Sequence, residues 1–267
     1  MMEAYRRRVE EGLDTYSRIS GIAPILGESM RYGLLDGGKR VRPCILLCAT
    51  EMLGGSLETA LPFACALEMV HCYSLIHDDL PAFDNDDYRR GKLSTHKKYG
   101  EANGILAGDG LLTLAGLLLS RQSGHDAAKT SILSAALDMA SGQSLDMQPV
   151  ERTEEYLHLL HRYKTGALFR AATEAAAHLA DRGELAETFA TLGETIGMLF
   201  QITDDLLDAE RDFAENKLTY VTFYGTERAK TYAAEAERKA VAILNDFDQP
   251  AADTLRQLIA AMTHRTY

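Results

Sequence analysis

Two short runs of the sequence place aspartates side by side next to apolar stretches. Residues 77–90 read HDDLPAFDNDDYRR, and residues 201–208 read QITDDLLD. Adjacent carboxylates repel one another, so solvent, a shared proton or a cation has to offset the repulsion. Oxygen ligands of this kind suit Mg²⁺, which takes one or two carboxylates and completes its shell with water and phosphate oxygens. Because both runs adjoin apolar, helix-like sequence, we predict a shared metal site.

Basic residues accompany both acidic runs. They are Lys39, Arg40 and Arg42 in GGKRVRP (37–43), Arg89 and Arg90 after the first run, Lys164 in YKTGALFR (163–170), and Lys217 after the second run. Two like unit charges about 4 Å apart repel by roughly 1 kcal/mol in water and about 4 kcal/mol at an effective dielectric of 20. An acidic pocket therefore excludes a bare diphosphate but binds one bridged by Mg²⁺. The pattern favours a diphosphate ligand.

The elements that must position the first run are predicted to be helices. Apolar residues recur with the period of a helix almost throughout the chain, and long Ala/Leu stretches are present. This pattern indicates an all-α protein. CALEMVHCYSLIHDD is expected to be a buried helix that ends at Asp78 and Asp79. Pro81 then loosens the helix, so that Asp84 folds back toward Asp78. Residues 102–119, ANGILAGDGLLTLAGLLL, are apolar nearly all round and predict a buried central helix.

The second run is expected to lie on a half-buried helix. Asp204 and Asp208 are four residues apart, and Asp205 and Asp208 are three apart, so all three can share a helix face. Residues 229–247 are amphipathic and predict a surface helix that packs inward. Plausible helix starts or breaks fall at Pro43, Pro62, Pro81, Pro149 and Pro250.

Composition narrows the class of protein. The chain has 267 residues and a formal net charge of −11, which argues against a nucleic-acid partner because phosphate contacts need a basic face. The N-terminus lacks the apolar core of a signal peptide, and no apolar run is expected to span a membrane. The four cysteines, Cys44, Cys48, Cys65 and Cys72, are expected to be reduced core residues of a cytoplasmic protein. No linker or composition shift divides residues 1–267, so we expect one all-α domain.

The motifs together resemble the trans-isoprenyl diphosphate synthases (polyprenyl synthetases), and bacterial farnesyl diphosphate synthases in particular. The likeness rests on HDDLPAFDNDDYRRGK, QITDDLLD, GGKRVRP and YKTGALFR in these relative positions, and GEANGILAGDGLL (100–112) adds to it. It runs from about residue 20 to the C-terminus. The resemblance implies a helical bundle of isoprenoid synthase type around a deep central cavity, with the two aspartate motifs facing each other across its mouth, and a homodimer.

The resemblance also implies a role for each matching residue. Asp78 and Asp84 would bind two Mg²⁺ ions and Asp204 a third. Asp79, Asp205 and Asp208 would act through water or by orienting the metal ligands. The allylic diphosphate would be held by Arg89, Lys164, Thr165, Gln201 and Lys217. Isopentenyl diphosphate would be held by Lys39, Arg42, His71 and Arg90. Taken alone, His71 is better explained as a core histidine, but together with the other motifs the binding role is favoured. His77 is interpreted as structural.

The implied reaction is a head-to-tail condensation. Magnesium and the cations neutralise the leaving diphosphate of dimethylallyl or geranyl diphosphate, and the double bond of isopentenyl diphosphate attacks the allylic cation. A proton is then lost to the departing diphosphate, while apolar walls exclude water. At about 1.5 Å per residue, Tyr73 lies roughly 7.5 Å down the helix from Asp78. Tyr73, with Ser74 beside it, is the implied chain-length position and favours farnesyl diphosphate as product.

One segment departs from the family pattern. Only AERDFAEN separates Asp208 from Lys217, where relatives carry a longer loop with glycine and lysine. Asn216 stands where a glycine is usual, and Leu218 stands where a small hydroxyl residue is usual. Because that loop helps to cover the bound diphosphate, affinity, closure or turnover is expected to differ here.

Four other functions remain open at this level. The chain could be a geranylgeranyl diphosphate synthase, or a binding subunit of a heteromeric synthase that does not catalyse, although both aspartate motifs are complete. A prenyl diphosphate cyclase of the same fold would not need the set of residues that matches a second substrate. A non-enzymatic acidic helical bundle would leave the paired motifs unexplained.

Overall fold

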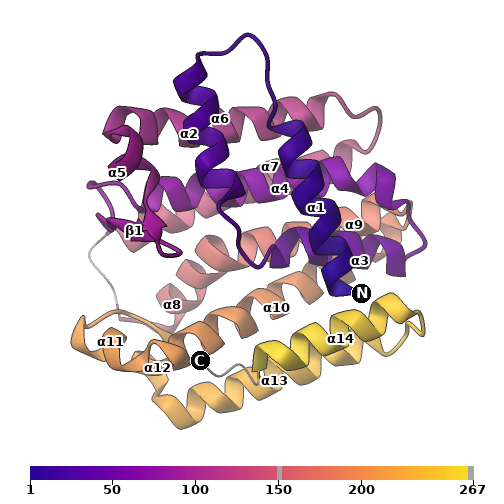
Figure 1. The fold of residues 1–267 in the computed structure, drawn as a ribbon. Coiled ribbons are helices and arrows are strands. Elements are labelled where there is room, and N and C mark those ends of the chain that lie inside the picture. Colours follow the sequence, from indigo (N-terminus) through magenta and orange to yellow (C-terminus); the bar gives the residue numbers. More distant parts are fainter. Residues whose placement is uncertain (149–151, 264–267) are drawn as a thin grey trace.

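Helices make up nearly all of the regular structure in residues 1–148 and 152–263, the residues that the computed structural model describes (Figure 1). The helices of the first half are α1 (Met2–Tyr16), α2 (Pro24–Leu35), α3 (Val41–Met52), α4 (Leu57–Asp78), α5 (Thr95–Tyr99), α6 (Glu101–Ser120) and α7 (Asp126–Asp146). Those of the second half are α8 (Glu154–His161), η1 (Arg162–Gly166), α9 (Ala167–Leu179), η2 (Gly183–Leu185), α10 (Ala186–Leu207), α11 (Ala209–Ala214), α12 (Tyr220–Tyr224), α13 (Thr226–Leu244) and α14 (Pro250–Thr263). The all-α prediction is confirmed.

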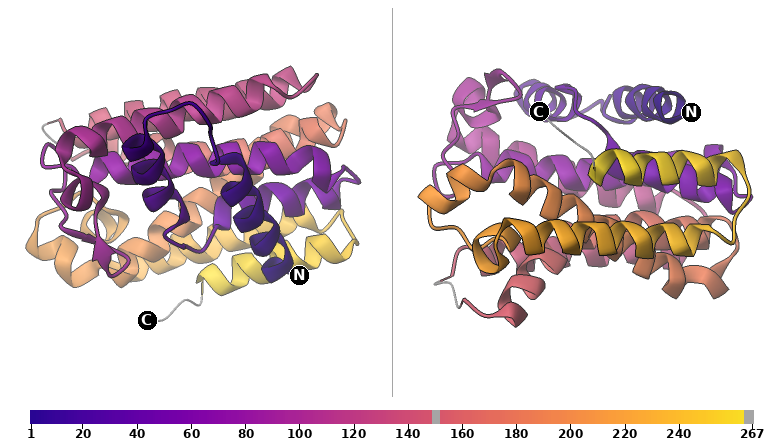
Figure 2. Two further views of the ribbon diagram at one scale, coloured as in Figure 1. Left: turned by 45° about the horizontal axis from the view of Figure 1, so that its top comes forward. Right: turned by 90° about the horizontal axis from the view of Figure 1, so that it is seen from below.

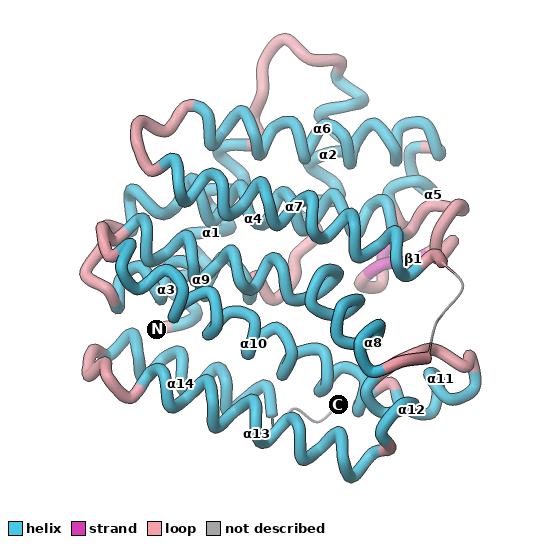
Figure 3. Tube along the Cα trace, turned by 180° about the vertical axis from the view of Figure 1, so that it is seen from behind, coloured by secondary structure: helices cyan, strands magenta, loops and turns pink. Residues whose placement is uncertain are grey.

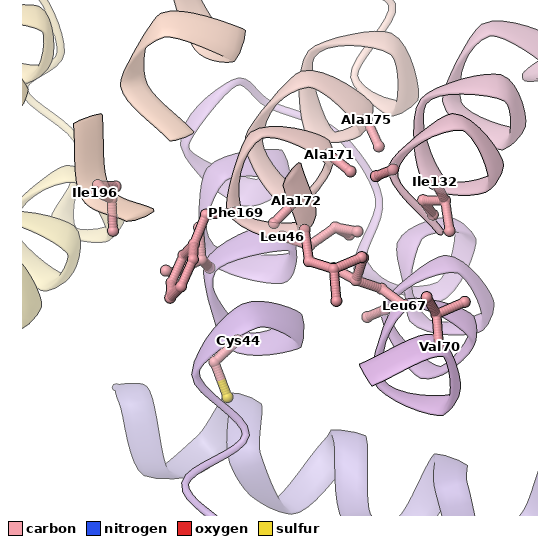
Figure 4. Packing of buried hydrophobic residues seen from close by; sticks show 14 of the residues in the cluster. Cys44, Leu46, Leu67, Val70, Ile132, Phe169, Ala171, Ala172, Ala175 and Ile196 are labelled. Carbon is pink, nitrogen blue, oxygen red and sulfur yellow. The ribbon is translucent and has the colours of Figure 1, made fainter. Parts of the chain in front are cut away.

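The long helices lie in layers. Seen from behind, α6, α7, α9, α10 and α13 follow one another across the molecule (Figure 3), while α1 and α2 cross the long helices on one side (Figure 2). One cluster of buried apolar side chains extends from Tyr5 to Met262. At its centre, Phe169 and the alanines of α9 pack among Leu46 of α3, Leu67 of α4 and Ile132 of α7 (Figure 4). The small alanine side chains let the neighbouring helices approach α9 closely.

Helix α4 is buried on most of its surface and carries the first acidic run at its end. It begins at the N-cap Ser56, whose hydroxyl accepts a hydrogen bond from the backbone of Thr59, and it runs to Asp78 with Asp79 as the C-cap. The predicted end of this helix is therefore confirmed. Pro62 lies inside the helix, so the prediction of a start or break there was wrong. Near the N-terminus a proline removes only one helical hydrogen bond, and the buried residues around it outweigh that loss.

Helix α6 corrects two expectations. It was predicted to be buried all round, but Ile105, Leu106 and Leu117 are each close to half exposed. By length and composition α4 and α6 are also apolar enough to cross a membrane, contrary to the expectation that no such run exists. For α4 this is explained by its place in the core, since 72% of its apolar window is buried inside the protein, against 44% for α6. An apolar pattern alone does not say what covers a helix.

The remaining predictions about elements are mostly confirmed. Helix α13 is amphipathic and buries one face, through Ala229, Ala233, Ala236, Ala240 and Leu244. Pro43 lies in the first turn of α3, Pro250 begins α14, and Pro81 follows the end of α4. The prediction for Pro149 lies outside the described residues.

Both acidic runs end at the same side of the bundle. In Figure 1 the small hairpin and α5, which follow α4, lie at the left, and so do α11 and α12, which follow α10. The C-terminal ends of α4 and α10 are thereby brought to one end of the molecule. The described cysteines, Cys44, Cys48, Cys65 and Cys72, are all free and buried, as predicted.

Candidate functional site

The two adjacent aspartates at the end of α4 point to different places. Asp78 lines a central cavity of about 510 Å³, and burial raises its pKa to about 6. Asp79 is only 2% exposed, and both of its carboxylate oxygens accept hydrogen bonds from the guanidinium of Arg89, at 2.8 and 2.9 Å from Nε. Asp84 folds back as predicted, because its backbone N–H donates to the carbonyl of Asp78 at 2.9 Å. Asp79 therefore holds Arg89 in place.

A two-residue hairpin turn positions the two arginines after the first run. Strands β1 (Tyr88–Arg89) and β2 (Lys92–Leu93) are antiparallel, and Arg89 pairs with Lys92. The turn residues Arg90 and Gly91 both have positive φ, 52° and 79°, which is the conformation that joins two twisted strands most tightly. The sequence shows no Asn-Gly or Asp-Gly pair here, which is why this hairpin was not predicted.

A second loop lies against the hairpin. Gly37 and Gly38 have φ of 77° and 120°, and a Cβ on Gly38 would lie 2.8 Å from the guanidinium carbon of Arg90. Arg90 also donates a hydrogen bond to the carbonyl of Gly37 at 2.5 Å. Arg40, with φ of 49°, forms the N-cap of α3. The absence of a side chain at Gly38 lets Arg90 approach this closely.

A buried ion pair fixes this loop to α4. The guanidinium of Arg40 donates to the carboxylate of Glu68 and to the carbonyl of Leu34, at 2.8 Å in each case. The side chains of Arg40 and Glu68 are 1% and 2% exposed. Glu68 stands three residues before His71 on the same helix, so the pair ties the loop to the part of α4 that carries His71.

The loop and α4 together form a basic pocket of about 460 Å³. It is lined by Asp36, Gly38, Lys39, Arg40, Val41, Arg42, Glu68, His71, Arg90 and Phe200. The guanidinium of Arg42 lies 4.4 Å above the ring of Phe169, its Nε has no hydrogen-bond partner among the described residues, and burial lowers its pKa to about 10. Burial and the nearby Arg42 and Arg90 hold the pKa of His71 well below its ordinary value, so His71 is neutral near pH 7. The pocket is suited to an anion.

The central cavity adjoins the basic pocket. Arg42 and His71 line both. The remaining walls of the cavity come from Tyr73, Ser74, Leu75, His77, Asp78, Phe83, Met139, Ala140, Gln143, Ser144, Met147, Lys164, Thr165 and Leu168. Most of this lining is apolar, and Tyr73 is 8% exposed. The cavity can accept an apolar chain with a charged group at its end.

The second acidic run forms an acidic pocket of about 270 Å³ with the segment that follows α10. It is lined by Asp146, Leu160, His161, Lys164, Thr165, Gln201, Asp204, Asp205, Asp208, Arg211, Asp212, Lys217, Leu218 and Thr219. All three aspartates predicted to share a face do line this pocket. Asp205 is 3% exposed, and burial raises its pKa to about 7. Asp208 pairs with Arg211 at 2.8 Å.

Lys164 and Thr165 line both the central cavity and the acidic pocket, and a π-helix places them there. The helical segment 154–179 passes from α8 through η1, a π-helical turn of five residues, into α9. A π turn accommodates an extra residue and often marks a functional site. Gly142 of α7 makes room for it, since a Cβ at 142 would lie 2.6 Å from Cα of Lys164. Nζ of Lys164 lies 2.5 Å from the Asp146 carboxylate.

A chain of hydrogen bonds connects η1 with the segment after α10. The hydroxyl of Thr165 donates to Oε1 of Gln201 at 2.5 Å, and Nε2 of Gln201 donates to Asp205 at 2.7 Å. The other carboxylate oxygen of Asp205 accepts from the backbone N–H of Tyr220 at 2.8 Å. Asp205 therefore anchors α12, just as Asp79 anchors Arg89. In each acidic run, the second of the two adjacent aspartates accepts hydrogen bonds from other groups of the protein.

The short segment between Asp208 and Lys217 has a defined conformation. It forms α11, and Asn216 has a φ of 54°, which explains how asparagine replaces the usual glycine, because asparagine tolerates the left-handed region better than most residues. Arg152 donates to both the backbone and the side-chain oxygen of Asn216, at 2.6 Å each. Lys217 lines the acidic pocket and lies 3.2 Å from the carboxylate of Glu215.

Several residues that line these spaces were missed in the sequence. Gln143 and Ser144 face the central cavity, Asp146 pairs with Lys164, and His161 and Asp146 line the acidic pocket. A signal was present: GQSLD places polar residues and a glycine together at the end of an alanine-rich helix. His161 gave no signal, because a histidine beside two leucines is typical of a core position.

The carboxylates fit a metal ion that is shared with a ligand. Within the described residues, no three His, Cys, Asp or Glu side chains are grouped so as to hold a metal ion by themselves. The burial of Asp78 beside Asp79 and Asp84, which raises the pKa of Asp78, nevertheless gathers negative charge that a cation would relieve. Mg²⁺ suits such a site, since it keeps several waters and is commonly completed by substrate phosphates.

The fold and the three connected spaces define a trans-prenyltransferase of the isoprenoid synthase type. The chain belongs to the polyprenyl synthetase family, whose sequence profile matches residues 23–262. It is an enzyme of isoprenoid synthesis, and the enzymes of this family are in general magnesium-dependent.

Similar proteins include synthases of two product lengths. The chain is 40% identical over 260 residues to farnesyl diphosphate synthase of Micrococcus luteus, covering 90% of this chain and 89% of that protein. It is 38% identical over 265 residues to the chloroplastic geranylgeranyl pyrophosphate synthase of Capsicum annuum, covering 90% and 72%. The crystal structure of geranyltranstransferase from Thermotoga maritima superposes with a TM-score of 0.87 at 32% identity, covering 99% of each chain.

Proposed function

We propose that the enzyme condenses isopentenyl diphosphate with dimethylallyl or geranyl diphosphate, releases diphosphate and makes farnesyl diphosphate. The observation that carries this proposal is the continuity of three spaces. The apolar cavity shares Lys164 and Thr165 with the acidic pocket, and it shares Arg42 and His71 with the basic pocket. A reaction between two diphosphates requires two anion sites that adjoin one apolar chamber, one site for each substrate.

The allylic diphosphate is assigned to the side of the two acidic runs. Asp78, Asp84 and Asp204 are the proposed ligands of Mg²⁺, three ions with substrate bound, which neutralise the charge of the leaving group when present. Lys164, Thr165, Gln201 and Lys217 line the acidic pocket and supply donors to the same phosphates. Asp79 holds Arg89, whose positive charge acts on the neighbouring carboxylate of Asp78. These fixed positive groups favour departure of the diphosphate.

Isopentenyl diphosphate is assigned to the basic pocket. Lys39, Arg42 and Arg90 surround it with positive charge, and neutral His71 contributes a hydrogen bond. The unpartnered Nε of buried Arg42 supports an anionic ligand, because a buried donor is normally paired. The substrate double bond is thereby oriented toward the allylic carbon at the junction marked by Arg42 and His71.

The central cavity is proposed to hold the growing chain. Its apolar walls exclude water, which would otherwise trap the allylic cation. The proton lost after condensation goes to the departing diphosphate, the strongest base at that point. Tyr73, with Ser74 beside it, closes the cavity and favours farnesyl over geranylgeranyl diphosphate.

Two copies of the chain are proposed to form a cytoplasmic homodimer of single-domain subunits. On α6 and α7 the side chains of Leu106, Leu117, Leu133 and Leu137 are 43% to 70% exposed. A second copy would cover this apolar face, and exposed patches of this kind mark interaction sites. The four buried free thiols support a reducing compartment. Sedimentation of the protein and of Leu137→Glu tests the dimer, which the charged residue should weaken.

The catalytic proposal is tested with the purified protein, Mg²⁺, isopentenyl diphosphate and each allylic starter in turn. Diphosphate release only when both substrates are present, with farnesyl diphosphate as the product, is the expected result. Release from the allylic substrate alone would instead identify a cyclase. No release at all would identify a binding subunit that does not catalyse.

A further inference from the structure

Tyr220 is the first residue of α12, and its side chain is almost completely buried, at 2% exposure. It has no role in the reaction proposed above, and the lining of the acidic pocket ends one residue before it, at Thr219. Lys217, which is assigned to the allylic diphosphate, stands three residues before it. The contacts that hold Tyr220 are therefore made very close to that lysine along the chain.

The ring of Tyr220 is held by α8, the helix that leads into the π turn. The imidazole of His161 stacks on it, with ring centroids 5.2 Å apart and an interplanar angle of 25°. Burial lowers the pKa of His161 to about 4, so its imidazole is neutral near pH 7 and the contact joins two uncharged rings. Such a stack fixes the plane of the tyrosine ring as well as its depth.

A second histidine of α8 holds the hydroxyl of Tyr220. Nδ1 of His158 lies 3.1 Å from this hydroxyl, and Nε2 lies 3.3 Å from the hydroxyl of Tyr224. Tyr224 donates its own proton to Glu154 at 2.6 Å, so it accepts from Nε2 of a neutral His158. Nδ1 then accepts from Tyr220. The ring and the hydroxyl of Tyr220 are thus both bound to α8.

Hydrogen bonds carry the position of α12 to the backbone of Lys217. The hydroxyl of Thr222 donates to the carbonyl of Lys217 at 2.6 Å, and Thr222 forms a capping box with Thr219. The N–H of Lys217 donates to the carbonyl of Asp212 at 3.0 Å. Helix α12 has only five residues, and isolated helices shorter than about 12 residues are marginal in water. Its placement therefore depends on the contacts of Tyr220.

The same contacts reach Lys164 from the other direction. His161 is the last residue of α8 and the N-cap of η1, and Lys164 follows three residues later in that turn. Helices α8 and α12 lie side by side at one end of the molecule (Figure 3). The stack of Tyr220 on His161 therefore joins the segment that carries Lys164 to the segment that carries Lys217, and both lysines line the acidic pocket.

We propose that Tyr220 is a positioning residue that fixes Lys217 relative to Lys164, so that both lysines meet one allylic diphosphate. This inference rests on the proposed function, which assigns the two lysines to that substrate. Loss of the ring frees α12 from α8 and displaces Lys217, while Lys164 keeps its place in the π turn. The basic pocket contains none of these residues, so binding of isopentenyl diphosphate is not affected.

Kinetics of two variants test this role. Tyr220→Leu removes the ring but keeps an apolar side chain, and the KM for geranyl diphosphate is expected to rise about tenfold while the KM for isopentenyl diphosphate stays unchanged. Tyr220→Phe keeps the stack and loses only the hydroxyl, so it should restore most of the affinity for geranyl diphosphate. Steady-state diphosphate release, with the other substrate at saturation, measures both KM values.

A matched control and a double variant separate positioning from general damage to the core. Phe189, at 0% exposure near the start of α10, is a buried ring away from the acidic pocket, so Phe189→Leu should lower the melting temperature without changing either KM. His161→Leu should raise the KM for geranyl diphosphate as Tyr220→Leu does. The double variant His161→Leu/Tyr220→Leu should raise it no further, because the stack is already lost.

Hydrogen exchange reports the position of Lys217 without any catalysis. In Tyr220→Leu, the peptide spanning residues 215–224 should exchange faster than in the unsubstituted enzyme, because α12 is no longer held by α8. In Phe189→Leu, exchange of this peptide should be unchanged. Equal exchange of the peptide in all three proteins would refute the positioning role.

The outcomes distinguish this inference from the proposed function. If the unsubstituted enzyme releases no diphosphate with both substrates, the proposed function is wrong, and hydrogen exchange alone decides the positioning role. If it is active but Tyr220→Leu changes both KM values equally or neither, only the role of Tyr220 is refuted. Should Tyr220→Leu fail to fold in a thermal melt, His161→Leu decides, because an unchanged KM for geranyl diphosphate in that variant refutes the role of the stack.

Discussion

The carboxylate of Asp205 accepts a hydrogen bond from the backbone N–H of Tyr220 at 2.8 Å, across fifteen residues of sequence. Its other oxygen accepts from Gln201 at 2.7 Å, so one buried side chain joins α10 to the start of α12. An aspartate that the motif marks as part of a metal site thus also fixes the start of α12, three residues after Lys217.

Asp205→Ala should destabilise the fold and weaken binding of the allylic substrate. It would leave the Tyr220 N–H and the Gln201 amide without their acceptor in a buried place, which costs about 3 kcal/mol. Urea denaturation measures the loss, and the KM for geranyl diphosphate should rise. Glu210→Ala, on exposed surface nearby, is the control. An Asp205→Ala protein as stable as the control would contradict the anchoring role.

Glu68→Gln should be strongly destabilising because it leaves the charge of Arg40 buried without its partner. Breaking such a pair costs about 3–5 kcal/mol. The KM for isopentenyl diphosphate should rise more than that for the allylic substrate, since the pair supports the loop of Lys39. The control is Glu11→Gln, which removes an exposed partner of Arg7 at 4.0 Å and should cost under about 1 kcal/mol. Equal effects of the two substitutions would count against the buried pair.

Lys164→Ala should lower kcat about 100-fold, as expected for removal of a fixed positive group beside a leaving diphosphate. Its ammonium lies within 2.5 Å of Asp146 and lines both the central cavity and the acidic pocket. Steady-state diphosphate release measures the effect. Lys230→Ala, which removes an exposed surface charge, should leave kcat unchanged. A Lys164→Ala enzyme with full activity would remove this lysine from the proposed mechanism.

Tyr73→Ala should lengthen the product, because it removes the side chain that is proposed to close the central cavity. Geranylgeranyl diphosphate should replace farnesyl diphosphate as the main product when isopentenyl diphosphate is in excess. Chromatography of the dephosphorylated alcohols measures the shift. An unchanged chain length in an active Tyr73→Ala enzyme would show that the cavity ends elsewhere.

The buried cysteines give a pH prediction. Burial raises the pKa of Cys44, Cys48 and Cys72 to about 12, from an ordinary value near 9. Since the thiolate is the reactive form, the folded protein should resist iodoacetamide at pH 9, whereas the urea-denatured chain should be alkylated at all of its cysteines. Because the thiols are harder to ionise in the folded protein than in the unfolded chain, they contribute fully to the free energy of unfolding below pH 9. This contribution is lost as the pH rises from 9 to 12. Mass spectrometry counts the labels, and rapid labelling of the folded protein would contradict this burial.

Local patterns predicted the end of α4, which carries the first acidic run, but not the direction of each side chain. The apolar stretch before Asp78 and the proline at 81 were enough to place the end of α4 and the return of Asp84. Whether Asp79 faces a metal or Arg89 depends on a hairpin whose turn, Arg90–Gly91, has no usual turn sequence. Contacts between distant segments decide such questions, and a single sequence does not encode them locally.

The sequence pattern also could not predict the π-helical turn at 162–166 or the exposed side of α6. Nothing in RYKTG signals a π turn, because the extra residue is accommodated by Gly142 on another helix. The apolar stretch at 102–119 looked fully buried, yet one side of α6 is exposed on the single chain. A partner subunit would produce the same apolar pattern as a protein core, so hydrophobicity alone could not distinguish the two.

Position 142 tolerates little substitution in this enzyme. Even alanine there would press on the backbone at Lys164 and force the turn at 162–166 to rewind. A change in either partner alone would displace Lys164, the lysine proposed to bind phosphate, without replacing that lysine. Gly142 and the additional residue of the π turn at 162–166 therefore have to be retained together or lost together.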